Sequence, residues 1–144
     1  MGADHNGFDM KQGLQEALVR AGYGVIDEGD QQFDPEDDFP QFAEHVVRAM
    51  KRSKDPDVRG ILICGSGQGM CMAANRFSGI RASLVWDVSE AHAARNDDDS
   101  NVLCLPARSI SKAEAVKIAE AWLATPFAGA SRFKRRIHEL DNLG

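Results

Sequence analysis

Residues 60–70 read Gly-Ile-Leu-Ile-Cys-Gly-Ser-Gly-Gln-Gly-Met, an apolar run followed at once by three glycines at alternate positions. A continuous run of this kind is typical of a strand buried on both faces of a parallel sheet. Gly65, Gly67 and Gly69 then let backbone N–H groups turn toward one point at the start of a helix, where an anion binds well. The pattern is neither a Walker A loop nor the GxGxxG dinucleotide fingerprint. It predicts an anion-binding loop, although a structural turn without a ligand stays open as an alternative.

Outward from this stretch, helical and strand patterns alternate along the chain, which indicates an α/β domain. We expect helices at about 9–20, from 39 to a point before 55, and at 70–76, 88–96, 112–124 and 132–140. We expect strands at 23–27, 60–64, 80–86 and 101–105. Residues 2–5 look like the tail of a further strand, so the first strand is expected to be truncated in this sequence. The pattern predicts one domain over residues 1–144, a three-layer α/β/α Rossmann-like sandwich with a mainly parallel sheet of about five strands.

The composition fits one globular domain, because 43% of the residues are hydrophobic and 27% are charged. A net charge of -5 disfavours nucleic acids and anionic membranes as partners. No apolar run approaches the roughly 18 to 20 residues of a membrane-spanning helix, and the first residues do not resemble a signal peptide. Three cysteines without CxxC spacing suit a reducing cytoplasm and give metal binding little support. We therefore expect a cytoplasmic protein that uses no metal, nucleic acid or membrane.

Cys64 ends the buried strand at the edge where open α/β sheets bind ligands. A thiol beside converging amides and a helix N-terminus is favoured as the thiolate and can act as a base. The alternative is a small buried hydrophobic side chain, which is the usual role of a free cysteine. Cys71 and Cys104 are assigned to that alternative, because one lies inside a predicted helix and the other inside an apolar strand.

Asp4 and His5 lie at a second strand end, directly before a helix, so their side chains can reach the same crevice. N-capping of that helix by Asp4 or Asn6 explains the pattern equally well.

Arg108 directly follows a strand, and Arg132 and Arg136 are four residues apart on one helical face. Guanidinium groups match the geometry of phosphate oxygens, although each arginine alone can equally be a solvated surface residue. Three arginines together with the glycine loop favour a phosphate-bearing ligand.

Six stretches of the chain also match a known family in order: Gly2–Phe8, Asp38–Ala43, Arg59–Met70, Ala73–Asn75, Gly79–Ala82 and Asn101–Arg108. Together they resemble the ribose-5-phosphate isomerase B family, which also includes the galactose-6-phosphate isomerase subunits. The likeness covers nearly the whole chain and is therefore specific.

The resemblance implies an aldose–ketose isomerase that moves a proton between carbon 1 and carbon 2 of a sugar phosphate through an enediolate, without a cofactor. In one branch of the family the base is a cysteine that falls on Cys64. In another branch it is a glutamate whose position is Met70 here. Residues 65–69 match the loop that holds the enediolate oxygens. The family builds its site between two subunits, which implies a homodimer or homotetramer with the helix at about 132–141 packed on a partner subunit.

The resemblance assigns site residues individually, with a one-residue insertion near residues 130–131 needed to align the last two. It implies catalytic roles for Cys64, Asp97 and Ser66, and substrate-binding roles for Asp4, His5, Gly65, Gly67, Gln68, Gly69, Asp98, Arg108, Arg132 and Arg136.

Two features depart from the family pattern. Family members usually carry a histidine that helps to open the furanose ring, and Asp97 stands at that position with Asp98 after it. A carboxylic acid has a reference pKa about 2.6 below that of histidine, so it is a poorer acid near neutrality. The second departure is an acidic insert at residues 33–37, for which the sequence offers no physical account.

Ribose-5-phosphate is the substrate that this resemblance favours. The alternatives are a hexose-6-phosphate of the galactose or allose type and a non-catalytic sugar-phosphate-binding protein. A nucleotide-binding module is disfavoured by the glycine pattern of the loop.

Overall fold

The structure, a computed structural model that describes residues 1–143, contains one sheet and six helices within those residues. The strands are β1 (Gly2–Ala3), β2 (Gly60–Cys64), β3 (Ala82–Leu84) and β4 (Val102–Pro106). They lie in the order β1-β2-β4-β3, and every neighbouring pair is parallel. The predicted α/β domain with a parallel sheet is confirmed, with four strands in place of about five.

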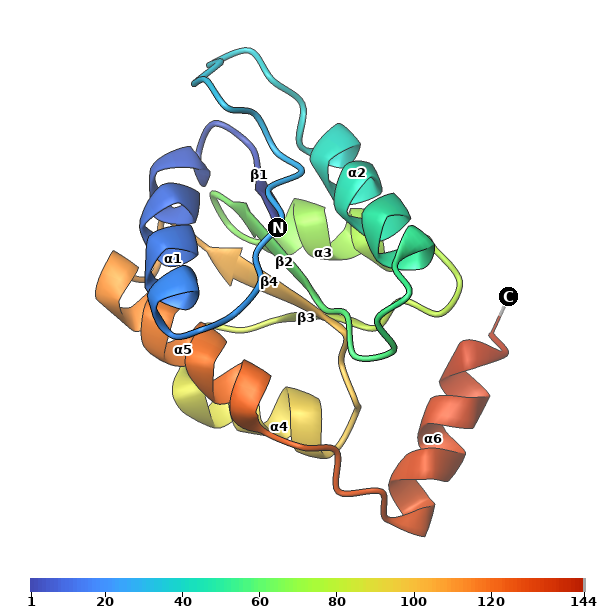
Figure 1. Cartoon of the computed structure of the whole chain (residues 1–144). Coiled ribbons are helices and arrows are strands. Elements are labelled where there is room, and N and C mark those ends of the chain that lie inside the picture. Colours follow the sequence, from blue (N-terminus) through green and yellow to red (C-terminus); the bar gives the residue numbers. More distant parts are fainter. Residues whose placement is uncertain (144) are drawn as a thin grey trace.

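The helices cover both faces of the sheet. They are α1 (Phe8–Arg20), α2 (Phe39–Arg52), α3 (Gln68–Ala74), α4 (Val88–Asn96), α5 (Lys112–Ala124) and α6 (Ser131–Asp141). One hydrophobic core joins the sheet to α1, α4 and α5, and a second joins it to α2 and α3. Figure 1 shows these two groups on opposite sides of the sheet, so the predicted three layers are present.

Successive residues of β2 face opposite layers, which explains its continuous apolar sequence. Ile61 and Ile63 belong to the core beneath α1, α4 and α5, whereas Leu62 and Cys64 belong to the core beneath α2 and α3. All five residues of β2 are buried. Cys64 therefore points toward the α2 and α3 layer, at the carboxyl end of the strand.

The strand predicted at residues 23–27 is wrong, since this segment is irregular in the structure. The amino group of Met1 donates to the carbonyl of Ile26 at 2.6 Å, and the N–H of Glu28 donates to the carbonyl of Met1 at 2.8 Å. The segment thus runs beside the beginning of β1 without forming a ladder. Ile26 is 70% exposed, so no second layer covers this segment as it covers the strands. The predicted strand tail at residues 2–5 is confirmed for Gly2–Ala3.

The other predicted elements are confirmed with small shifts at their ends. The predicted helices at 88–96 and 112–124 coincide with α4 and α5, and the capping box of α5 is formed by Ser111 and Glu114. The helix after the glycine loop begins at Gln68 because Gly67, with φ of 74°, serves as its N-cap. The strand predicted at 80–86 is reduced to the three residues of β3.

The C-terminal helix α6 stands apart from the sheet and from the two groups of helices that cover it (Figure 1). Phe133 is the buried residue of this helix, and Asp141 near its end pairs with Arg81 at 3.3 Å. Leu140 is 51% exposed. Over residues 1–143, none of the helices has the length and apolar character needed to cross a membrane.

Candidate active site

The glycine loop closes over the end of β2. The backbone N–H of Gly67 donates to Sγ of Cys64 at 3.2 Å, and the N–H of Gln68 donates to Oγ of Ser66 at 3.3 Å. Gly67 adopts φ of 74°, and a Cβ added there would lie 2.4 Å from a methyl group of Leu84. Only glycine fits both the left-handed backbone and the contact with β3. The loop conformation predicted from the glycine spacing is thus built into the β2–α3 junction.

Arg108 lies directly on this loop. Its backbone N–H donates to the carbonyl of Gly65 at 2.9 Å, and the N–H of Ala107 donates to the carbonyl of Cys64 at 2.9 Å. A Cβ added at Gly65 would lie 2.7 Å from Nε of Arg108, so the absence of a side chain at residue 65 makes room for the guanidinium. Arg108 is exposed. Its charge is available to a ligand beside the loop.

The turn after β1 lies next to Cys64. Ala3 pairs with Ile63, and the N–H of Asp4 donates to the carbonyl of Ile63 at 3.2 Å, so Asp4 continues the register to the level of Cys64. A Cβ added at Gly7 would lie 2.6 Å from the carbonyl oxygen of Ile63, which shows how closely the turn approaches β2. Adjacent strands are about 4.8 Å apart, so the turn and the cysteine belong to one crevice.

Asp4 is buried and stabilises its own turn. Its Oδ1 accepts the N–H of Asn6 at 3.0 Å and the N–H of Gly7 at 3.2 Å. Burial raises the pKa of Asp4, and these hydrogen bonds together with the charge of His5 oppose the rise. The side chain therefore caps a turn before α1 rather than the first turn of the helix, whose N-cap is Gly7.

His5 is held by a residue that the sequence interpretation did not assign. Oδ1 of Asp37 lies 2.6 Å from Nδ1 of His5 and also accepts the backbone N–H of His5 at 3.0 Å. The hydrogen bond to Asp37 raises the pKa of His5, while partial desolvation opposes the rise. Asp37 belongs to the acidic segment before α2, so part of that segment now has a structural explanation.

Phe39, at the start of α2, is a second missed residue of this edge. A Cβ added at Gly69 would lie 2.9 Å from its ring, so the ring packs directly on the glycine loop. Phe39 is 37% exposed. The sequence carries no local signal for this contact, because Phe39 and Gly69 are 30 residues apart.

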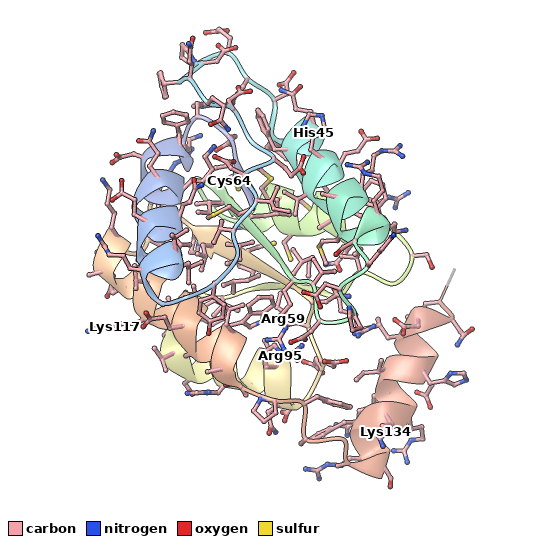
Figure 2. The ribbon with its side chains drawn as sticks, in the orientation of Figure 1. His45, Arg59, Cys64, Arg95, Lys117 and Lys134 are labelled. Carbon is pink, nitrogen blue, oxygen red and sulfur yellow. The ribbon has the colours of Figure 1, made fainter. Side chains whose placement is uncertain are left out.

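Four other predicted site residues lie at the opposite edge of the sheet: Asp97, Asp98, Arg132 and Arg136. Asp97 and Asp98 follow α4 and precede β4, whose first residue, Val102, pairs with Gly60 at the beginning of β2. The five residues of β2 separate its two ends by about 13 Å, at roughly 3.3 Å per residue. Figure 2 shows Cys64 near one end of the sheet and Arg95, just before Asp97, near the other.

The arginines of α6 belong to that opposite edge. The N–H of Ala128, shortly before α6, donates to the carbonyl of Asn96 at the end of α4, at 3.1 Å. Burial raises the pKa of Asp98, the charge of Asp97 adds to the rise, and the charge of Arg136 opposes it. Arg132 is four residues earlier on the same helix. The structure therefore does not bring these four residues to Cys64 within one chain.

A cavity of about 440 Å³ opens at this second edge. Its arginines have protein partners: Arg81 and Arg95 both pair with Asp99, and Arg59 donates to the carbonyl of Leu123 at 2.9 Å. Asp99 has φ of 46°, which is uncommon for a residue with a side chain. Arg81 and Arg95 thus hold the turn between α4 and β4, and Arg59 holds the end of α5. In the part of the chain that the structure describes, no group of three or more His, Cys, Asp and Glu side chains is arranged to hold a metal ion.

Comparison with known protein families matches residues 1–140 to the family described as Ribose/Galactose Isomerase. A probable ribose-5-phosphate isomerase B of Mycoplasma genitalium is 41% identical over 138 residues, which are 96% of this chain and 90% of the relative. Ribose-5-phosphate isomerase B of Escherichia coli is 35% identical over 96% of this chain and 91% of its own.

Solved structures give the same result. A ribose-5-phosphate isomerase from Thermotoga maritima superimposes with a TM-score of 0.92 at 37% identity, covering 99% of this chain and 95% of that one. Ribose-5-phosphate isomerase B from Mycoplasma genitalium, solved with bound ribulose-5-phosphate, has a TM-score of 0.91 at 41% identity. That match covers 97% of this chain and 91% of the other. These likenesses extend over the whole domain rather than one motif.

Proposed function

The chain belongs to the ribose/galactose isomerase family, and we propose that it interconverts ribose-5-phosphate and ribulose-5-phosphate with Cys64 as the base. The observation that carries this proposal is the meeting of Cys64, the glycine loop and Arg108 at the carboxyl edge of the sheet. A thiol, converging amides and a cation are the groups that proton transfer on a phosphorylated sugar requires.

In the forward direction the Cys64 thiolate takes the proton from carbon 2 of the open-chain aldose. The electron pair of the broken C–H bond forms the double bond between carbon 1 and carbon 2, and negative charge moves to the oxygen on carbon 1. The thiol then returns the proton to carbon 1, while the hydroxyl proton on the oxygen of carbon 2 passes to the oxygen of carbon 1. The product is the ketose, with a carbonyl at carbon 2 and a hydroxyl at carbon 1. The same thiol serves both transfers, because carbon 1 and carbon 2 are bonded neighbours.

The loop stabilises the enediolate oxygens. Its backbone is fixed by the left-handed Gly67 and by the contact of Gly69 with Phe39, so its N–H groups need little reorganisation as charge develops. The exposed Ser66 hydroxyl can donate to the same oxygens while its Oγ accepts from Gln68. In this proposal Asp4, level with Cys64, contacts the sugar hydroxyls, and Arg108 contacts the phosphate.

We assign the remaining contacts to a second subunit. Within one chain, Asp97, Asp98, Arg132 and Arg136 lie at the far edge of the sheet, so they can act on the substrate at Cys64 only from a neighbouring copy. The separate position of α6 supports this arrangement, because a helix that leaves its own domain can reach a partner (Figure 1). A twofold dimer then has two equal sites, each with Cys64 from one subunit and Arg132 and Arg136 of the partner subunit.

In this proposal Asp97 takes part in ring opening by accepting the hydroxyl proton on carbon 1 of the furanose. The bond between carbon 1 and the ring oxygen breaks in the same step, and the ring oxygen takes a proton from solvent water. The reference pKa of an aspartic acid lies well below neutrality, so its side chain is poorly suited to supply that proton itself. A non-catalytic sugar-phosphate binder is the second candidate function, and the aspartate at residue 97 is the observation that favours it.

A substrate panel tests the proposed function. Purified protein is assayed for isomerisation of ribose-5-phosphate, allose-6-phosphate and galactose-6-phosphate, and binding of the same sugars is measured by calorimetry. Turnover of ribose-5-phosphate with the highest kcat/KM is expected. Binding without turnover of any member would replace the proposal with the second candidate function, and preferential turnover of a hexose phosphate would change the substrate assignment.

A further inference from the structure

The contact between His5 and Asp37 joins two segments of the carboxyl edge that are 32 residues apart in the chain. His5 belongs to the turn after β1, beside Cys64, and Asp37 belongs to the segment that leads into α2. The Asp37 side chain is 4% exposed, whereas that of His5 is 32% exposed. The carboxylate is therefore shielded from water, and the imidazole that it holds remains open to a ligand.

Asp37 fixes both the position and the tautomer of this imidazole. One oxygen, Oδ1, lies 2.6 Å from Nδ1 of His5 and accepts the backbone N–H of His5 at 3.0 Å. Ring and backbone are thus tied to the same atom, and Nδ1 must carry a proton, because a carboxylate only accepts. Nε2 is the ring atom left for other partners. Its present neighbour is the exposed amide nitrogen of Asn6, at 3.1 Å, which donates, so Nε2 accepts in this arrangement and is free of a proton.

The charges around His5 favour its protonated form. The hydrogen bond that His5 donates to Asp37 raises the pKa of His5 most, and the charges of Asp37, Asp4 and Glu36 raise it further, against partial desolvation. Asp37 and Glu36 face His5 from the segment before α2, and Asp4 faces it from its own turn. A protonated imidazole has N–H groups at both ring nitrogens, so it can donate to Asp37 and to an anion at the same time.

We propose that Asp37 is a positioning residue, which holds His5 as an oriented cation so that Nε2–H of His5 donates to the phosphate of the substrate. The inference rests on the proposed function, because it takes a sugar phosphate as the ligand of this edge. A protonated His5 adds a cation to the edge that holds Arg108, and its charge offsets the carboxylates of Asp97 and Asp98 that the proposed partner subunit brings near a dianionic substrate. The substrate would displace the amide of Asn6 from Nε2, which then takes up a proton.

Replacing Asp37 with Asn tests this role, because the amide keeps the size of the side chain and removes its charge. The KM for ribose-5-phosphate should rise on the order of tenfold at pH 7.5, with kcat within about twofold, since the phosphate is bound equally in the ground and transition states. In the wild type, KM should begin to rise only as the pH passes the pKa of His5. In Asp37→Asn that rise in KM should begin at lower pH. The ionisation of the substrate phosphate is the same for both proteins, so it cannot cause this difference.

Glu36→Gln is the matched control, because it removes a charge near His5 that makes no hydrogen bond to it. This variant should change KM little.

A second measurement is made on the wild type and needs no turnover. The imidazole of His5 is followed by two-dimensional proton–nitrogen spectra during a pH titration, with and without inorganic phosphate as the probe. His5→Gln identifies the signal among the four histidines of the chain. We expect Nδ1 to stay protonated in the neutral form and phosphate to raise the pKa of His5, because binding and protonation are reciprocally linked.

Isomerase activity of the wild type tests the proposed function separately. A phosphate-independent titration of His5, or a kcat loss at unchanged KM in Asp37→Asn, would overturn the role of Asp37 even in an active isomerase.

Discussion

The backbone N–H of Gly67 points at Sγ of Cys64, 3.2 Å away, so the loop that we propose to hold the substrate also contacts the proposed base. The contact directs a positive N–H dipole toward the sulfur atom that holds negative charge in the thiolate. Base and loop therefore form one unit, and a change in either is expected to affect catalysis more than substrate binding.

Cys64→Ser should reduce kcat by about 100- to 10,000-fold, the usual contribution of a general base, while sugar-phosphate binding is retained. The measurement is exchange of the carbon-2 hydrogen of ribose-5-phosphate with solvent deuterium, followed by NMR. Cys71→Ser is the matched control, because Cys71 lies on α3 outside the crevice and should keep full exchange. Exchange at the wild-type rate in Cys64→Ser would assign the base to another residue.

Gly67→Ala should destabilise the domain by about 1 to 3 kcal/mol and abolish turnover. The left-handed backbone opposes a side chain at residue 67, and the new methyl group would meet Leu84 at 2.4 Å. Urea denaturation gives the free energy of unfolding. Gly24→Ala is the control, since a Cβ at residue 24 meets nothing within 4 Å. Equal losses in both variants would mean that the loop conformation is not the cause.

Asp97→His should raise kcat for ribose-5-phosphate if ring opening limits the rate, because an imidazole can exchange protons near neutral pH. The pH–rate profile should then gain an ionisation between about pH 6 and 7. Asp97→Asn removes the charge without supplying an imidazole and separates the two effects. An unchanged or lower kcat in Asp97→His would indicate that Asp97 is adapted to another substrate.

A mixture of two inactive variants should recover activity if the site is shared between subunits. Cys64→Ser and Arg136→Ala chains, unfolded together and refolded in equal amounts, form mixed dimers in which one of the two sites is intact. About one quarter of the wild-type activity per chain is expected from random pairing. The pair Cys64→Ser and Arg108→Ala is the control, because both changes damage the same edge and every site stays defective. No recovery in the first mixture would contradict the shared site.

The capping box of α5 should make part of the stability acid-sensitive. The hydrogen bonds of Glu114 to Ser111 lower the pKa of Glu114 below its usual value of 4.5. A carboxyl group whose pKa is lower in the folded state stabilises the fold above its unfolded pKa and loses this effect as the pH falls through the folded value. The difference in melting temperature between wild type and Glu114→Gln should therefore be present at pH 7 and shrink below pH 4.5. A difference that stays constant down to pH 3 would remove the charge from the explanation.

The order of helices and strands was predictable because the decisive patterns are local. The apolar run of β2, the glycine spacing after it and the capping box of α5 each depend on neighbouring residues. The strand predicted at 23–27 was wrong because a strand also needs a partner and a covering layer, and neither is encoded within the segment itself.

The common edge of three candidate groups was predictable in the same way. Cys64, Arg108 and the turn at Asp4 all stand at the carboxyl ends of strands of one parallel sheet, so their shared edge follows from the topology. The contact of Asp37 with His5 spans 32 residues and has no local pattern, and it could be recognised only in the folded chain.

The separation of Cys64 from Arg136 across the sheet also has a consequence for gene dosage. If active sites form only where two copies meet, then at expression levels too low for complete pairing the metabolic flux through this step rises with the square of the chain concentration. Halving expression in that regime would reduce the flux about fourfold, as second-order association requires. A defective allele that still pairs would lower the output of the healthy copy as well as its own.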